Sequence, residues 1–174
     1  MRVIMRKIWR YFVLGLVNNF LRGTHFFKLK RALLNSCYGL SVGVGTKIVA
    51  PITVYGTMQI GNNCWIGHDF SVEGNGKVFI GDNCDIAPSV FCLTGSHEIS
   101  SNSDRRAGKG ISFNISIGDG CWIGARSTLM GNIIVRSGTV IGACALVTKS
   151  TENDSLYAGV PAHKIKNLFD ICHG

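Results

Sequence analysis

The chain has 174 residues, a length that fits one domain of ordinary size. Its net charge of +8 resides in the first 40 residues, because the remainder carries equal numbers of basic and acidic side chains. This distribution argues against a nucleic-acid-binding core, which would need a positive face on the folded domain itself. The 7 cysteines include no CxxC pair and favour reduced, structural thiols, which implies a reducing compartment such as the cytoplasm.

Residues 1–40 form a basic, apolar arm without any Asp or Glu, and two helices are expected on either side of Gly23. The uncharged segment from Tyr11 to Leu21 is shorter than the ~18–20 residues that span a bilayer. Two uses of the arm stay open. Its apolar faces either pack on the first coil or between subunits, or they form an amphipathic foot on the inner face of the cytoplasmic membrane.

A six-residue repeat occupies residues 41–151. Its period is neither that of a helix nor that of a two-sided strand, so it predicts stacked coils that bury their aliphatic residues against one another. One large inward residue recurs every six positions at Val42, Ile48, Val54, Ile60, Ile66, Val72, Ile80, Ile86, Cys92, Ile117, Ile123, Leu129, Val135, Ile141 and Val147. A smaller residue follows four positions later at Thr46, Cys64, Cys84, Val90, Cys121, Ser127, Thr139 and Ala145.

The repeat breaks in the stretch LTGSHEIS. Between Cys92 and Ile117 there are 25 positions where six would keep register, so an inserted loop is expected at residues 98–116, directly after His97. Long loops in compact folds are uncommon and usually functional or disordered. The insertion therefore predicts an active site beside His97.

Residues 152–174 follow the repeat. Pro161 is suited to the first turn of a helix, and an apolar face would then be shared by Ile165, Leu168, Phe169 and Cys172. We expect a C-terminal helix packed against the β-body.

The segments CLTGSHEI, ISIGDGCWIGA, VIGACALVTKS and YAGVPAHKI occur in this order. The chain thereby resembles the hexapeptide-repeat acyltransferases, and among them the O-acetyltransferases of galactosides, maltose and exopolysaccharides of the colanic-acid type, over about residues 40–168. The resemblance implies an all-β fold, a left-handed parallel β-helix with the helical arm before it. It also implies a homotrimer with active sites between subunits.

By this resemblance His97 is the general base that removes a proton from an attacking alcohol, a task that suits imidazole near neutral pH. Glu98 is a candidate to orient the ring, and a backbone carbonyl would serve equally well. Direct attack on the thioester needs no acyl-enzyme. Cys92 sits in the aliphatic register and is expected to point into the core.

The implied co-substrate is acetyl-CoA, with no metal. The residues that match the family's cofactor groove are Trp122, Ala125, Ala143, Thr148, Lys149, His163 and Lys166. The backbone N–H of Ala125 is the candidate oxyanion donor. Lys149 and Lys166 are open to the alternative of solvated surface lysines, and His163 departs from the family's frequent Lys or Arg, which weakens a phosphate contact there.

An irregular VEGNGKVF, with two extra residues between Val72 and Ile80, is the natural place for the acceptor. The candidates for hydrogen bonds to sugar hydroxyls are Asp69, Glu73 and Asn75. Each of them is explained equally well as a solvated turn residue. The other histidines lack metal-ligand spacing; they are His25, His68, His163 and His173.

These observations predict an acetyl-CoA-dependent O-acetyltransferase acting on a sugar or a surface-polysaccharide precursor. The alternatives are the same chemistry on a sugar amine, serine or a xenobiotic, and a non-catalytic glycan-binding solenoid.

Overall fold

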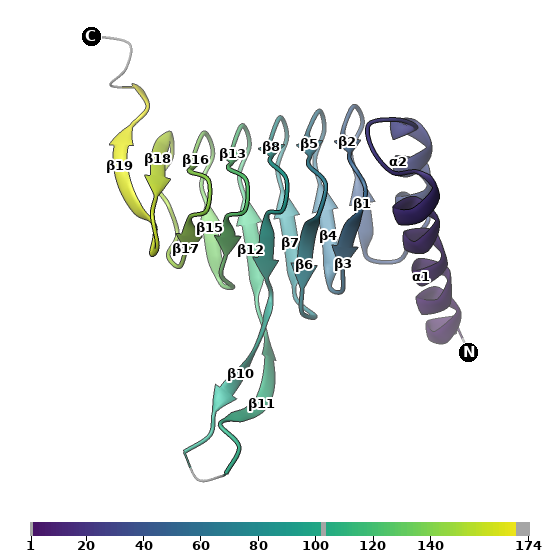
Figure 1. The fold of residues 1–174 in the computed structure, drawn as a ribbon, viewed down its shortest axis with the longest axis horizontal. Helices are drawn as coiled ribbons and strands as arrows, with labels where there is room; N and C mark the ends of the chain where they lie inside the picture. Colours follow the sequence, from purple (N-terminus) through teal and green to yellow (C-terminus); the bar gives the residue numbers. More distant parts are fainter. Residues whose placement is uncertain (1, 102–103, 170–174) are drawn as a thin grey trace.

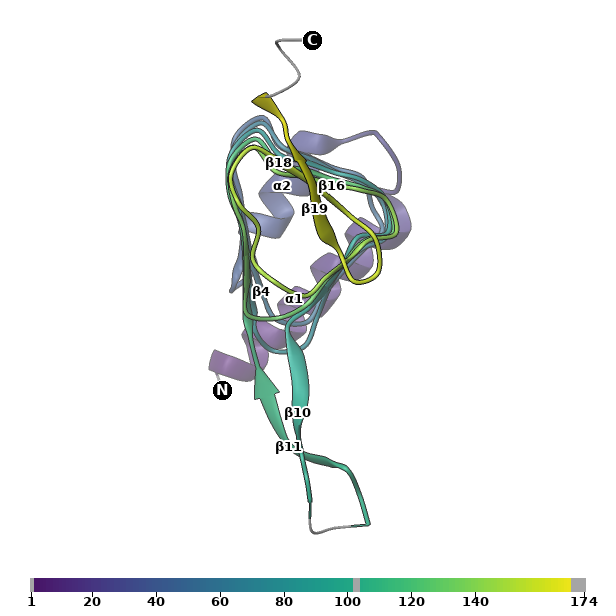
Figure 2. The same ribbon diagram turned by 90° about the vertical axis from the view of Figure 1, so that its left-hand side faces the viewer.

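The computed structural model describes residues 2–101 and 104–169 as an elongated stack of β-coils with two helices at one end (Figure 1). The helices are α1 (Arg2–Phe20) and α2 (Phe27–Asn35), on either side of Gly23 as expected. Viewed along the stack, the coils superimpose as a triangle, which is the cross-section of a parallel β-helix (Figure 2).

Three sheets form the faces of this prism, and each complete coil contributes one parallel strand to each face, while the second face also carries the antiparallel β19. The first face contains β1 (Leu40–Val42), β4 (Thr57–Ile60), β7 (Lys77–Ile80), β12 (Asn114–Ile117) and β15 (Ile133–Val135). The second contains β2 (Lys47–Ile48), β5 (Trp65–Ile66), β8 (Asp85–Ile86), β13 (Trp122–Ile123), β16 (Val140–Ile141), β18 (Ser155–Ala158) and β19 (His163–Asn167). The third contains β3 (Ile52–Val54), β6 (Phe70–Glu73), β9 (Phe91–Leu93), β14 (Thr128–Leu129) and β17 (Leu146–Val147).

We name the corners by the faces they join. The first corner links the first and second faces, the second corner links the second and third, and the third corner returns from the third face to the first. Successive coils place equivalent residues in columns along each corner, about 4.8 Å apart, because neighbouring strands are hydrogen-bonded at that spacing.

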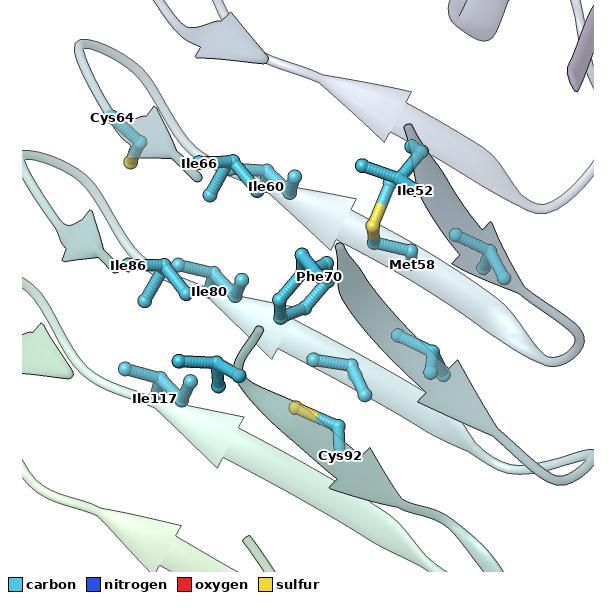
Figure 3. Close-up of a cluster of buried hydrophobic side chains, with 14 of the residues drawn as sticks. Ile52, Met58, Ile60, Cys64, Ile66, Phe70, Ile80, Ile86, Cys92 and Ile117 are labelled. Carbon is cyan, nitrogen blue, oxygen red and sulfur yellow. The ribbon is translucent and has the colours of Figure 1, made fainter. Parts of the chain in front are cut away.

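The hexad pattern is confirmed as the pattern of the core. Every large residue predicted to point inward is buried, and so is every small residue predicted four positions later. Figure 3 shows Ile60, Ile66, Ile80, Ile86 and Ile117 of this set inside the prism. The left-handed parallel β-helix implied by the family resemblance is the fold of residues 40–158.

A further layer of core residues was not predicted. On the first face the residues two positions before each hexad aliphatic are also buried, namely Leu40, Met58, Val78, Ile115 and Ile133. Alternate residues of a strand point to the same side, so these longer strands contribute two inward side chains each. Ile115 pairs with both Val78 and Ile133, and the coil therefore resumes at β12, earlier than the Ile117 predicted.

The first corner carries a column of thiols. The Sγ atoms of Cys64, Cys84 and Cys121 lie 3.1, 3.0 and 3.1 Å from the carbonyl oxygens of Gly81, Gly118 and Arg136. All six cysteines of the described residues are free thiols, as predicted. The buried thiols of the first-corner column, Cys64, Cys84 and Cys121, act as small core residues that also donate to the backbone of the next coil.

The helical arm closes the first end of the prism. Val13 and Val17 of α1 are fully buried. The Arg10 guanidinium donates to the carbonyls of Val54 and Gly56, both at 2.7 Å. Asn18 exchanges two hydrogen bonds with the backbone of Ile52. One face of the arm thus packs on the coil, which confirms the packing alternative for that face.

The predicted C-terminal helix is wrong for residues 161–169. Here β19 runs antiparallel to β18, with Leu156 opposite Lys166 and Ala158 opposite His163. The last coil leaves the N–H and C=O groups of β18 without a next coil, and a returning strand satisfies them where a helix would not. Cys172, part of the predicted helix face, lies outside the described residues.

The inserted loop is an antiparallel hairpin that projects from the third corner (Figure 1). Its strands are β10 (Gly95–Ile99) and β11 (Ala107–Ser112), so it begins before the 98–116 boundary predicted and ends inside it. At its base Gly74 has φ 101° and touches the backbone of Gly95 so closely that a Cβ would clash. Glycine is required at this crossing.

Candidate functional site

His97 lies on β10, on the part of the hairpin that leaves the prism. Its ring is exposed, and Nδ1 lies 2.8 Å from the carbonyl oxygen of Gly108 on the returning strand. A carbonyl only accepts, so Nδ1 carries the hydrogen and the neutral ring presents the lone pair of Nε2. The neutral ring is therefore held in the tautomer whose Nε2 can accept a proton.

Glu98 is exposed beside it. The group that orients the ring is the Gly108 carbonyl. A backbone carbonyl was the alternative to Glu98 that the sequence left open. The hairpin is further held by Arg106, whose Nη1 donates to the carbonyls of Ser100 and Ser101 at 3.1 and 3.3 Å.

Two of the predicted acceptor residues lie on the coil that precedes the hairpin. Glu73 pairs with Leu93, and its carbonyl accepts a hydrogen bond from the Thr94 N–H at 2.7 Å. Asn75 is exposed in the same turn. The turn 73–76 therefore packs directly against the base of the strand that carries His97.

Asp69 is not part of this group. It sits at the second corner, where its carboxylate lies 2.8 Å from Nδ1 of His68. The third face separates it from the turn 73–76, so the structure does not bring the three predicted acceptor residues together.

The second corner presents a column of backbone amides. Within the described residues, the N–H groups of Ala125 and Ala143 donate no hydrogen bond, while the Ala125 carbonyl accepts from Cys144 N–H at 2.8 Å. The two alanines occupy equivalent positions one coil apart, as predicted, and Ala143 is exposed. His163, opposite Ala158, extends the same corner to the last coil.

The second face carries Trp122 and Lys166 in one outward column. Trp122 pairs with Val140, Val140 with Leu156, and Leu156 with Lys166. The Trp122 side chain is 57% exposed. Trp65 in the same column instead packs edge-on against the Phe27 ring of α2 at a centroid distance of 6.0 Å, so of the two indoles only Trp122 is free for a ligand.

Thr148 and Lys149 follow β17 at the third corner, the corner of the hairpin, and both are exposed. The predicted cofactor residues therefore fall into two groups on either side of the third face. Ala125, Ala143 and His163 border it at the second corner, and Thr148 and Lys149 border it at the third.

The family description "Bacterial transferase hexapeptide (six repeats)" matches residues 114–149 of the chain. Over this segment the chain is similar to bacterial transferases with hexapeptide repeats. The matched segment runs from β12 to the turn after β17 and contains both alanines of the amide column.

Among relatives of this hexapeptide-repeat protein, the galactoside O-acetyltransferase of Escherichia coli (strain K12) is 31% identical over 75% of the chain. The chain spans 64% of that relative's length. The putative colanic acid biosynthesis acetyltransferase of the same organism is 28% identical, over 78% of the chain and 74% of the relative.

A solved structure with the same fold is the hexapeptide-repeat-containing acetyltransferase of Vibrio cholerae in complex with acetyl coenzyme A. It matches with a TM-score of 0.81 at 23% sequence identity and covers 97% of this chain and 90% of that one. At this identity the match establishes the shared fold, including the arm.

Cys92 is the thiol nearest to the hairpin in sequence, in the middle of the third-face strand β9. It is fully buried, and burial raises the pKa of its thiol to about 12. The neutral thiol in the core is unreactive, because the thiolate is the nucleophile. This agrees with chemistry that does not pass through a cysteine. No metal-type cluster of His, Cys, Asp or Glu occurs within residues 2–101 and 104–169.

Sequence reasoning missed Gly108, whose carbonyl selects the His97 tautomer. No motif marks a backbone acceptor. The available signal was the antiparallel return of the inserted segment, which places its second half opposite His97.

Proposed function

We propose that the protein transfers acetyl from acetyl-CoA to a hydroxyl group of a sugar, within the assembly of a surface polysaccharide. The observation that carries the proposal is the exposed His97 ring, held by the Gly108 carbonyl with Nε2 free. The likeness to a galactoside O-acetyltransferase and to a putative colanic acid biosynthesis acetyltransferase supports the sugar acceptor.

In the proposed reaction, Nε2 of His97 takes the hydroxyl proton as the acceptor oxygen attacks the thioester carbonyl carbon. A carbon–oxygen bond forms, and the carbonyl oxygen becomes an oxyanion that the Ala125 N–H stabilises. The carbon–sulfur bond then breaks, and the imidazolium returns its proton to the leaving sulfur. The products are an acetyl ester and the free thiol of coenzyme A.

The amide column suits the co-substrate, because pantetheine offers amide carbonyls that accept from backbone N–H groups. Ala143 supplies such a donor one coil away from Ala125, whose N–H is reserved for the oxyanion in the proposed reaction. Trp122 provides an exposed apolar surface nearby, and Lys149 and Lys166 provide charge for the phosphates. Glu73 and Asn75 are the proposed acceptor contacts at the hairpin base, with Asp69 restricted to the second corner.

The active site is proposed to lie between subunits of a homotrimer. Because the hairpin carries His97 away from the prism, a second surface is needed to enclose the reacting groups (Figure 1). The proposed location is the cytoplasm, since the six free thiols suit a reducing compartment.

The proposal is tested by thiol release from acetyl-CoA against a panel of sugars, amino sugars, serine and chloramphenicol. We expect release that depends on a hydroxyl-bearing sugar, with an O-acetyl product seen by mass spectrometry. Release only with an amine would establish N-acetylation instead. Coenzyme A binding without turnover on any acceptor would favour the non-catalytic solenoid.

Replacing Ala125 by Pro is expected to lower the turnover number by about 10²–10³, the loss typical for one oxyanion donor. The substitution removes the N–H alone, because Pro88 occupies the equivalent position of the preceding coil and shows that the corner accepts proline. Steady-state kinetics and a thermal unfolding midpoint measure the two effects. An intact fold with unchanged turnover would remove Ala125 from the oxyanion role.

A further inference from the structure

The outer face of α1 is apolar where a helix on a protein surface is normally polar. Ile4, Ile8 and Phe12, spaced by four residues, form one stripe and are 61%, 57% and 61% exposed. Met5 and Trp9 border the stripe at 62% and 44% exposed. We call these five residues the α1 stripe.

Ile4, Ile8 and Phe12 of the α1 stripe point away from the body of the protein, and Trp9 lies at the border with α2. The residues that dock the helix, Val13 and Val17, are fully buried. They follow Ile4 and Ile8 by nine positions, which is two and a half helical turns, so the two pairs face opposite directions. The first turns of α1 also reach beyond the triangular outline of the coils (Figure 2).

The same end of the molecule is strongly basic. The chain has no Asp or Glu before Asp69, and the 68 residues up to that point include nine Lys and Arg. Lys7 on α1 and Lys28 on α2 are exposed, and the Arg6 guanidinium lies over the Tyr38 ring at 5.0 Å beside the stripe. An apolar stripe among cations and no anions is complementary to an anionic lipid surface.

Trp9 suits the boundary of such a surface. Its indole Nε1 donates to the Ser36 hydroxyl at 2.9 Å, so the ring has a fixed orientation with its polar edge satisfied. Its ring packs against Phe12 at a centroid distance of 5.8 Å. Tryptophan is enriched where hydrocarbon meets headgroups, because its ring is apolar and its N–H is polar.

We propose that the α1 stripe docks the protein onto an anionic lipid membrane, with α1 lying in the plane of the headgroups. The contact is peripheral. No helix among the described residues is long and apolar enough to cross a membrane. The inference is independent of the proposed reaction, because it concerns the end of the prism opposite to β19 and its readout is lipid binding.

The test is co-sedimentation of the full chain with vesicles of phosphatidylcholine and phosphatidylglycerol in equal parts, against phosphatidylcholine alone. We expect binding to the anionic vesicles that weakens as NaCl is raised. The variant Ile4→Ser/Ile8→Ser/Phe12→Ser should lose at least about tenfold in binding, since each apolar side chain contributes to burial in the interface. The charge variant Lys7→Gln/Lys28→Gln should lower binding at low salt.

The matched control is Ile165→Ser/Phe169→Ser, which removes two exposed apolar side chains at the other end and should bind vesicles like the wild type. In a Trp65→Phe/Trp122→Phe background, Trp9 is the remaining tryptophan, and its emission should shift to the blue on anionic vesicles.

Failure of the wild type to bind anionic vesicles, or equal binding by the serine variant, would overturn the proposal. A fall in oligomer mass of the serine variant by light scattering without lipid, together with no vesicle binding by the wild type, would assign the stripe to contacts between copies of the chain.

Discussion

His97→Ala is expected to lower the rate of acceptor-dependent thiol release by about 10²–10⁴, the contribution typical of a positioned general base. The substitution removes the ring whose Nε2 stays free because Nδ1 donates to a backbone carbonyl on β11. Affinity for coenzyme A should be retained, because the amide column at Ala125 and Ala143 is untouched. Isothermal titration and steady-state kinetics separate the two effects.

His25→Ala provides the matched control, because His25 lies in the exposed connection between the helices, far in sequence from the hairpin. Its rate should equal that of the wild type. Added imidazole should restore part of the activity of His97→Ala, which a purely structural role would not allow. An unchanged rate in His97→Ala would contradict the assignment of His97 as the general base, and only the assignment of the fold would then stand.

Phe70→Ala is expected to lower the free energy of unfolding by about 3–5 kcal/mol, the usual cost of truncating a buried phenylalanine. Phe70 is fully buried at the start of β6 and lies between Ile80 and Met58 in the core (Figure 3). It is the largest residue in its column, where the other coils place Ile52, Val90 and smaller side chains. The rigid neighbouring coils cannot collapse into the space it leaves. Urea unfolding at fixed protein concentration measures the difference.

Phe12→Ala removes a phenylalanine that is 61% exposed, and its effect on unfolding should stay within about 0.5 kcal/mol. If the two variants unfold alike, the inward assignment of Phe70 is contradicted. A change of urea slope in Phe70→Ala, without a change of midpoint, would instead indicate an altered denatured state.

The hexad period was sufficient to predict most of the core, because each coil repeats the same inward positions and local order dictates long-range contacts. The period said nothing of the added layer at Met58 and Ile115, where strands are longer than the repeat unit. The structure after Ser155 was also not predicted correctly. The spacing of Ile165, Leu168 and Phe169 suits a helix, but the segment forms a strand because β18 would otherwise have an unpaired edge.

The candidate site was predicted unevenly, because its parts depend on different kinds of information. The break in register located His97, and one-coil spacing aligned Ala125 with Ala143. Which corner a turn occupies depends on the exact count of residues between strands, so Asp69 and Glu73, four positions apart, fall at different corners. The partner of the His97 ring is a carbonyl, and backbone atoms leave no trace in composition.

The two ends of the prism also prevent further coils from adding to the stack. A stack of parallel coils with bare ends would template further strands, from its own copies above all, and would extend into fibres. Here a helical plug seals one terminus, while the reversed strand at the other bears His163, Lys164 and Lys166 along its open border. The exposed Lys166 ammonium repels an incoming copy of the same edge, whereas the Lys164 ammonium is paired with Glu152, so the edge is a poor template for a further coil.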